Sequence, residues 1–171
     1  MRPTTLVFPI DEDNRILLGR KKRGFGADKY NGFGGKLNPG ESFRACAVRE
    51  LFEESGLSAR EEDLECVALF DFHFDESLTH VSYVYFLRTF TGIVAETDEM
   101  EPHWFKPEDV PYAHMWDGDR RWLPMLLENK KLKGPIVFAR DNSTVDKMDL
   151  TAVESVMESE HLARIDLYIN E

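Results

Sequence analysis

The sequence predicts one α/β domain in which helices cover both faces of a mixed β-sheet. Its 171 residues fall within the usual size of a single domain, and no internal repeat or low-complexity linker divides them. Short segments rich in aromatic and β-branched residues are interspersed with two segments of helical periodicity. Strands mixed with substantial helices in this way indicate a sheet covered on both sides.

The first elements are two strands, a glycine-dense loop and a long helix. The strands are expected at Thr5–Pro9 and Arg15–Gly19, with Asp11–Asn14 as the turn between them. The loop spans residues 24–35, with five glycines. The helix is expected over Glu41–Ser55, because Pro39-Gly40 precedes it and Gly56 is a natural terminator.

The later elements are mostly strands. They are expected at Val67–Phe74, at Val81–Arg88, in a short strand that ends with Trp104-Phe105, and more weakly at Pro135–Phe138 and Val145–Leu150. A second helix is expected over Asp119–Lys130. From Thr151 we expect a short helix through Val153, Val156 and Met157, then a strand in which Ile165, Leu167 and Ile169 alternate with polar residues. We therefore expect residues 1–150 to form the domain and 151–171 an extension packed on it.

Charge and composition exclude several classes of protein. Lys and Arg number 21 and Asp and Glu 32, a net charge of −11, which disfavours long nucleic acids as partners but not a small phosphorylated ligand. No apolar run approaches the roughly 20 residues of a membrane span, and the N-terminus lacks a signal peptide's apolar core. Cys46 and Cys66 show no metal-binding spacing. We expect a cytoplasmic monomer with reduced cysteines and no structural zinc.

Three glutamates share one face of the first helix. At 100° per residue, Glu50, Glu53 and Glu54 lie within an arc of about 100°. A solvated acidic face is the ordinary interpretation, but these like charges repel each other near the helix end that disfavours anions. A divalent cation would remove both penalties, and oxygen-only ligands favour Mg²⁺ or Mn²⁺ over Zn²⁺. Arg49 is spaced to pair with Glu53 and orient it.

The helix and the loop before it match the Nudix box, GX5EX7REUXEEXGU, at every position. The matching residues are Gly35, Glu41, Arg49, Glu50, Leu51, Glu53, Glu54, Gly56 and Leu57. From about Thr5 to Leu150 the chain resembles the MutT-type oxidised-purine nucleoside triphosphatases, particularly their mammalian branch. Stretches that carry the wider resemblance include residues 21–27, 31–36, 98–100 and 115–116. The last 20 or so residues have no counterpart that we can place.

The resemblance implies a Nudix α/β/α sandwich with a mixed, curved sheet. It implies Mg²⁺-dependent hydrolysis of a nucleoside triphosphate to a monophosphate and pyrophosphate, with Mn²⁺ as a substitute. It assigns metal binding to Glu50, Glu53, Glu54 and the Gly35 carbonyl, with Glu99 as a further acid near the metal. Glu53 is the leading candidate for the catalytic base and Glu99 the second. Such a cation neutralises the phosphates and lowers the pKa of bound water.

Four cations, Arg20 to Arg23, directly precede the glycine-dense loop. They are either a solvated strand edge or a place where Lys21 or Arg23 binds phosphate. The P-loop pattern GxxxxGK[ST] is absent from the sequence, so a P-loop enzyme is not expected.

A purine pocket is the other implied site. Phe70, Phe72 and Phe74 alternate along one strand, which is either a plain core face or the wall of an apolar slot. The family comparison places around the base Phe25, Phe70, Phe72, Trp116 and Trp122, with Val81 and Met100 as apolar contacts. Asn31 matches an amide that meets the base edge, although an Asn before Gly is also a common turn former.

The chain departs from the family at two positions of this pocket. Where the mammalian branch has two consecutive acids, this chain has Gly118 followed by Asp119. Two adjacent carboxylates can share a proton and so accept different oxidised bases, which puts broad base tolerance in doubt here. Asp117 would compensate only if the loop slipped by one residue. Thr4 stands where the family has an aromatic residue, so a wider slot is expected.

Three functions are consistent with the sequence. The first is hydrolysis of oxidised purine nucleoside triphosphates such as 8-oxo-dGTP. The second is a Nudix hydrolase of another diphosphate-linked substrate, such as a dinucleoside polyphosphate or a nucleotide sugar. The third, a non-catalytic nucleotide-binding module, is disfavoured because all carboxylates of the box are intact.

Overall fold

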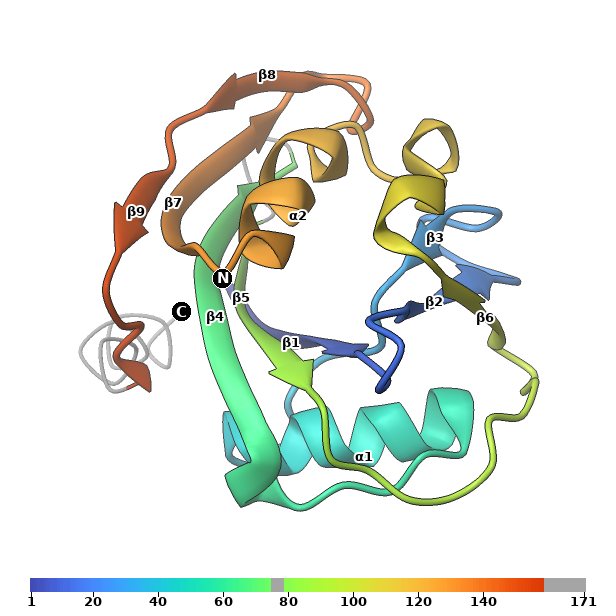
Figure 1. The fold of residues 1–171 in the computed structure, drawn as a ribbon. Helices are drawn as coiled ribbons and strands as arrows, with labels where there is room; N and C mark the ends of the chain where they lie inside the picture. The colour runs from blue at the N-terminus through green and yellow to red at the C-terminus, as the bar shows by residue number, and fades with distance from the viewer. Residues whose placement is uncertain (75–78, 159–171) are drawn as a thin grey trace.

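The computed structural model describes residues 1–74 and 79–158. Its main sheet has the order β1-β5-β4-β7-β8, with β9 also paired to β7 (Figure 1). These strands are β1 Arg2–Pro9, β4 Leu64–His73, β5 Thr79–Leu87, β7 Lys131–Phe138, β8 Val145–Met148 and β9 Thr151–Val153. A second, antiparallel sheet consists of β3 Tyr30–Asn31, β2 Ile16–Lys21 and β6 Met100–Phe105. The main sheet is mixed, because β1 pairs with β5 in parallel and β5 with β4 antiparallel.

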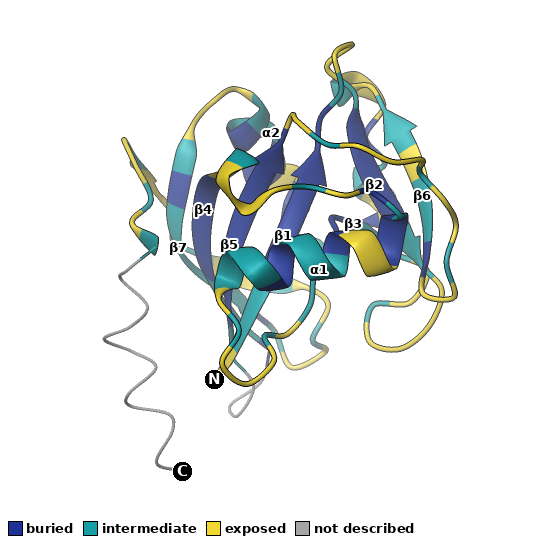
Figure 2. Ribbon diagram, turned by 90° about the horizontal axis from the view of Figure 1, so that it is seen from below, coloured by how far each residue is buried: buried dark blue, intermediate teal, exposed yellow. Residues whose placement is uncertain are grey.

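Two α-helices, α1 (Phe43–Ser55) and α2 (Asp119–Leu127), pack on opposite faces of the main sheet (Figures 1 and 2). On β1, Val7 belongs to the buried cluster that contains α1, and Leu6 and Phe8 belong to the cluster that contains α2. Three short 3₁₀ turns lie at Glu61–Asp63, Pro107–Asp109 and Tyr112–His114. The predicted α/β sandwich is therefore confirmed.

Local sequence explains the limits of α1. The Ser42 hydroxyl accepts a hydrogen bond from the Ala45 N–H at 3.0 Å, so Ser42 caps the helix and α1 begins at Phe43 instead of Glu41. At the other end Gly56 adopts the left-handed conformation, with φ of 80°, and its N–H donates to the Phe52 carbonyl.

The glycine-dense loop is held against β1. The Thr5 N–H donates to the Gly35 carbonyl at 3.0 Å and the Val7 N–H to the Phe33 carbonyl. A Cβ at Gly34 would lie 1.8 Å from the Thr5 carbonyl oxygen, so only glycine allows this approach. The loop is thereby fixed beside the start of α1.

Apart from the tail after Leu150, the predicted helices and strands are present with ends that shift by up to four residues, but the short strand β3 was not predicted. Helix α2 ends at Leu127, before the predicted Lys130, because Asn129 adopts a positive φ of 64° and β7 begins at Lys131. The predicted helix through Val153, Val156 and Met157 is wrong, since Thr151–Val153 forms β9 against β7 and residues 154–157 are not helical. The expected strand around Ile165 lies outside the described residues.

Both cysteines are buried and free of disulfide bonds. Among the described helices, none has the length and apolar character needed to cross a membrane.

Candidate active site

A cavity of about 620 Å³ lies against the loop at Gly34 and Gly35 and extends to α2. Its aromatic wall consists of Phe25, Phe72, Phe74, Trp116, Trp122 and Phe138. The cations that line it are Arg2, Lys21, Lys29 and Lys36, and its acids are Glu54 and Asp119. A cavity with four cations in a chain of net charge −11 is suited to an anionic ligand that also has an apolar part.

The aromatic end of the cavity is built from ring contacts between distant segments. The Phe25 and Trp116 ring centroids lie 5.1 Å apart, and Phe74 stacks on Phe138 at 4.8 Å. A Cβ at Gly26 would meet the Trp116 ring at 2.9 Å, so glycine lets this loop close over the indole. These rings frame a flat slot of the kind that a purine fills.

Asp119 is the buried acid of this end. It is 3% exposed, and burial raises its pKa to about 8, against the opposing effects of nearby groups such as Lys29. Among the described residues, neither its Oδ2 nor the Trp122 Nε1 has a hydrogen-bond partner. Two buried polar atoms without partners at the wall of a cavity are suited to hydrogen bonding with a ligand.

The loop before Asp119 has not slipped. The Asp117 Oδ2 accepts a hydrogen bond from the Val145 N–H of β8 at 2.9 Å, so the Asp117 side chain is held against β8. A Cβ at Gly118 would lie 2.8 Å from the Met148 Cε and 3.2 Å from the Val145 Cγ2, so strand β8 occupies the space of a side chain there. Asp119 is consequently the acid that this loop presents to the cavity.

Several residues of the predicted base site do line the cavity. They are Lys21, Phe25, Asn31, Phe72, Met100, Trp116, Asp119 and Trp122. The Asn31 Oδ1 also accepts a hydrogen bond from the Gly32 N–H at 2.8 Å, so Asn31 shapes the turn as well.

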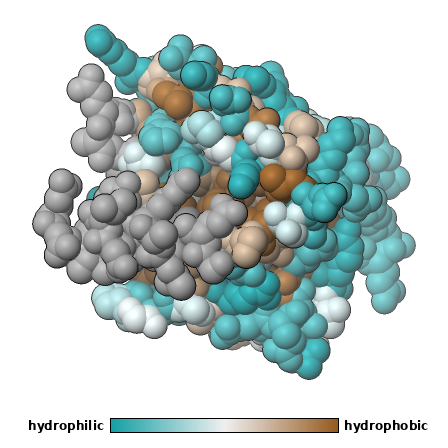
Figure 3. Space-filling view, turned by 90° about the vertical axis from the view of Figure 1, so that its left-hand side faces the viewer, coloured by the Kyte–Doolittle hydropathy of each residue, from teal (hydrophilic) through white to brown (hydrophobic). Residues whose placement is uncertain are grey.

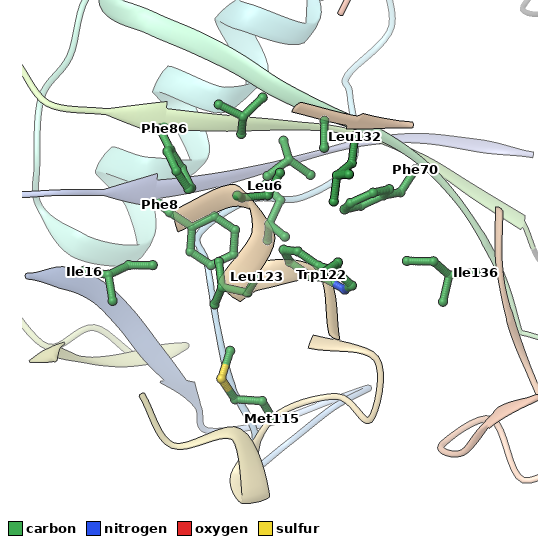
Figure 4. Close-up of a cluster of buried hydrophobic side chains, with 14 of the residues drawn as sticks. Leu6, Phe8, Ile16, Phe70, Phe86, Met115, Trp122, Leu123, Leu132 and Ile136 are labelled. Carbon is green, nitrogen blue, oxygen red and sulfur yellow. The ribbon is translucent and has the colours of Figure 1, made fainter. Parts of the chain in front are cut away.

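Two predicted base contacts lie elsewhere. Phe70 is fully buried in the α2 core beside Trp122, with ring centroids 5.1 Å apart (Figure 4), so it supports the cavity without lining it. The predicted contact of Val81 with the base is wrong, because Val81 packs in the buried cluster that contains α1. Its neighbours His80 and Ser82 line the cavity instead. The period of two along a strand predicts that alternate residues share a face, but not which face meets the ligand.

Lys29 and Phe138 also line the cavity, although neither was predicted from the sequence. The Lys29 Nζ lies 5.4 Å from the Trp116 ring centroid, in the arrangement of a cation–π contact. A cation within a glycine-dense loop is a signal that could have pointed to Lys29. Phe138 lies more than 60 residues from the other wall strand, and only the pairing of β7 with β4 brings it to the cavity.

Arg49 organises the acids of α1. Its Nε donates to the Glu41 Oε1 at 2.7 Å, and its Nη1 lies 2.7 Å from the Glu50 Oε1 and 3.3 Å from the Glu53 Oε2. The expected Arg49–Glu53 pair is therefore present, within a larger network. The adjacent acid Glu54 points away from it into the cavity.

Glu54 is 4% exposed and accepts one hydrogen bond, from the Gly34 N–H at 2.7 Å. Burial raises its pKa to about 8, and the negative charges of Glu50 and Glu99 add to the effect. Burial also raises the pKa of Glu50, whose carboxylate lies so close to Gly35 that a Cβ there would be 2.6 Å from its Oε1. Several acids thus oppose one another's ionisation at the end of the cavity next to the loop.

This acidic end fits a divalent cation in its chemistry. All side-chain donors are carboxylate oxygens, and a bound cation would offset the burial and repulsion that now disfavour their ionised forms. The described residues do not form a finished cage, since no three acid, His or Cys groups among them come close enough to hold an ion. The Gly35 carbonyl already accepts a hydrogen bond from Thr5. Glu99 and Arg23 do not line the cavity; their side chains pair with each other at 3.6 Å, and the charge of Glu99 acts on Glu54.

The fold and this loop–helix arrangement define the class of protein. A model of the NUDIX domain matches residues 1–126, and the chain belongs to the Nudix family. Nudix hydrolases use divalent metal ions.

Within the family, the chain is similar to two vertebrate proteins. It is 40% identical to the oxidized purine nucleoside triphosphate hydrolase of Mus musculus, over 88% of this chain and 95% of that protein. It is also 40% identical to the hydrolase of the same name from Danio rerio, over 85% and 92% of the two chains. Among solved structures, a MutT protein from Bacillus halodurans superposes with a TM-score of 0.76 at 23% identity, over 88% of this chain and 97% of that one.

Proposed function

We propose that this protein hydrolyses oxidised purine nucleoside triphosphates, such as 8-oxo-dGTP, to the monophosphate and pyrophosphate, and so removes damaged nucleotides from the pool. The observation that carries the proposal is one continuous cavity that joins the aromatic slot at Asp119 to Glu54 of the Nudix box. The 40% identity to two oxidized purine nucleoside triphosphate hydrolases supports the same substrate class.

The base and the phosphates would bind at opposite ends of the cavity. The rings of Phe25, Phe72 and Trp116 would hold the flat purine, and Asp119 would hydrogen-bond to its edge. Lys21 at the cavity wall would offset the charge of the phosphates, and Arg23, two residues further along the chain, would add a second cation. Such a division lets the base determine binding while the phosphates meet the acids.

Mg²⁺ is the proposed ion, with Mn²⁺ as a substitute, held by Glu50, Glu53 and Glu54 with help from Glu99 and the remaining acceptor capacity of Gly35. When bound, the ion supplies charge neutralisation and an activated water. Glu53 is the proposed base because its side chain is 55% exposed, against 15% for Glu50, so water can reach it. Arg49 would orient it, and Glu99 is the alternative base.

We also propose that the protein acts as a cytoplasmic monomer. The two free, buried cysteines and the acidic surface support a reducing compartment without a membrane or a long nucleic acid as partner.

A hydrolase of another diphosphate-linked nucleotide is the second candidate. The observation that favours it is a part of the cavity wall with two cations and two hydroxyl groups, formed by Arg2, Lys36, Thr4 and Ser82. This wall would accept a second anionic or polar group attached to the phosphates.

A thermal-shift panel with and without Mg²⁺ separates these functions. We expect 8-oxo-dGTP with Ca²⁺, or its monophosphate with Mg²⁺, to raise Tm more than dGTP, ADP-ribose or diadenosine tetraphosphate. Product analysis with Mg²⁺ should then give monophosphate and pyrophosphate. A larger shift and faster turnover with a dinucleotide would favour the second candidate, and binding without turnover of any compound would contradict both.

A further inference from the structure

The last described residues cross the α1 side of the main sheet. Val156 packs against the buried cluster that contains α1 and β5, and the Tyr83 hydroxyl donates to the Met157 carbonyl at 3.1 Å. Glu158 lies between α1 and β5 through its contacts with Arg44 and Tyr85. This segment, residues 156–158, lies beyond the residues that match the NUDIX domain, 1–126. Figure 3 views the molecule from the β9 side, where hydrophobic residues show between hydrophilic ones.

Arg44, in the first turn of α1, is held in place by groups other than Glu158. Its Nη1 donates to the carbonyls of Glu61 at 2.6 Å and Leu64 at 3.0 Å. Its guanidinium carbon lies 5.6 Å from the centroid of the Tyr85 ring. Two hydrogen bonds and a ring contact fix the plane of the guanidinium, so that one edge of it is presented in a set orientation.

Glu158 fills that presented edge. Its Oε1 and Oε2 accept hydrogen bonds from the Arg44 Nε at 3.0 Å and Nη2 at 2.7 Å, which is the bidentate arrangement. The Tyr85 hydroxyl donates to the Glu158 Oε1 at 2.7 Å. Tyr85 is fully buried, so removal of the carboxylate would leave its hydroxyl and the facing guanidinium edge without their present partner.

We propose that Arg44, Tyr83 and Tyr85 form a docking site for a short acidic segment, and that its occupant is residues 156–158 of the same chain. The site recognises three features: an apolar side chain (Val156), a carbonyl one residue later (Met157) and a carboxylate after that (Glu158). The extension is thus an integral part of the domain, anchored to the helix that carries the Nudix carboxylates. This proposal does not depend on the substrate.

The test is hydrogen exchange of the full-length protein, followed by mass spectrometry over residues 151–158. Glu158→Gln should accelerate exchange of this segment by roughly tenfold or more, as expected for a lost charge-assisted pair. Glu154→Gln is the matched control, because it makes the same change on an exposed glutamate within residues 151–158 and should leave exchange at the wild-type rate. Equal exchange in the two variants would overturn the proposal.

A double-mutant cycle shows whether Arg44 is the partner. Arg44→Met and the double variant with Glu158→Gln should exchange at similar rates, because the second change removes nothing more. Additive effects would show that Glu158 acts elsewhere and overturn the assignment. Protection that falls on dilution, together with a dimer at high concentration, would show that a second copy fills the site and would overturn the intramolecular assignment.

Discussion

Replacement of Asp119 by Asn tests how this protein reads its base. With a pKa of about 8, Asp119 is roughly nine-tenths protonated at pH 7 and one-tenth at pH 9, and only the protonated form can donate a hydrogen bond. The amide of Asn does not change with pH. The kcat/KM of wild type for 8-oxo-dGTP, divided by that of Asp119→Asn, should therefore change about tenfold between pH 7 and pH 9.

The ratio cancels pH effects that both proteins share, such as those at the glutamates. At pH 7 the amide should cost roughly 1–3 kcal/mol in kcat/KM, because it presents its donor in a different position. Asp117→Asn is the matched control, since Asp117 binds β8 outside the cavity, and its ratio to wild type should stay constant. A constant ratio for Asp119→Asn from pH 6.5 to 9.5 would show that Asp119 does not bind the base through its protonated form.

Three further predictions follow from burial and close contacts. Because the pKa of Asp119 is raised in the folded state, the free energy of unfolding of wild type should fall relative to that of Asp119→Asn as the pH rises from 4 to 8, by at most about 1.4 kcal/mol per pH unit. Urea unfolding at each pH measures this difference, and a difference that does not change with pH would contradict the prediction. Glu53→Gln should lower kcat by roughly 10²-fold or more, and excess EDTA should abolish turnover in steady-state assays; full activity in EDTA would exclude the metal mechanism. Gly34→Ala should destabilise by about 2 kcal/mol or more in thermal unfolding. Gly40→Asn should cost less, about 1 kcal/mol, because Gly40 has open space around it and Asn tolerates its positive φ of 77°.

The fold and the acidic helix were predictable because local signals agree. Gly56 ends α1 as predicted, and the spacing of Glu50, Glu53 and Glu54 determines which helix face carries them. The start of α1 was two residues off, since Ser42 forms a cap that the Pro39-Gly40 signal did not locate. Such boundaries depend on single hydrogen bonds.

The walls of the cavity were less predictable because they depend on tertiary contacts. A strand pattern could not tell whether Val81 or His80 faces the ligand, and no local signal brings Phe138 to Phe74. The lack of space for a side chain at Gly118 is likewise due to Met148, which reaches this position because β8 pairs with β7. Glu158 contacts Arg44 although the two residues lie 114 positions apart, and no local sequence pattern indicates this contact.

We propose that one cavity couples recognition of an oxidised base to hydrolysis at the Nudix helix. This coupling is tested by kcat/KM for 8-oxo-dGTP and dGTP with Mg²⁺, with the products identified by ³¹P NMR. We expect monophosphate and pyrophosphate, with 8-oxo-dGTP preferred by tenfold or more, the factor that about 1.4 kcal/mol of hydrogen bonding at Asp119 supplies. Equal kcat/KM for the two nucleotides, or release of inorganic phosphate from a diphosphate product, would contradict it.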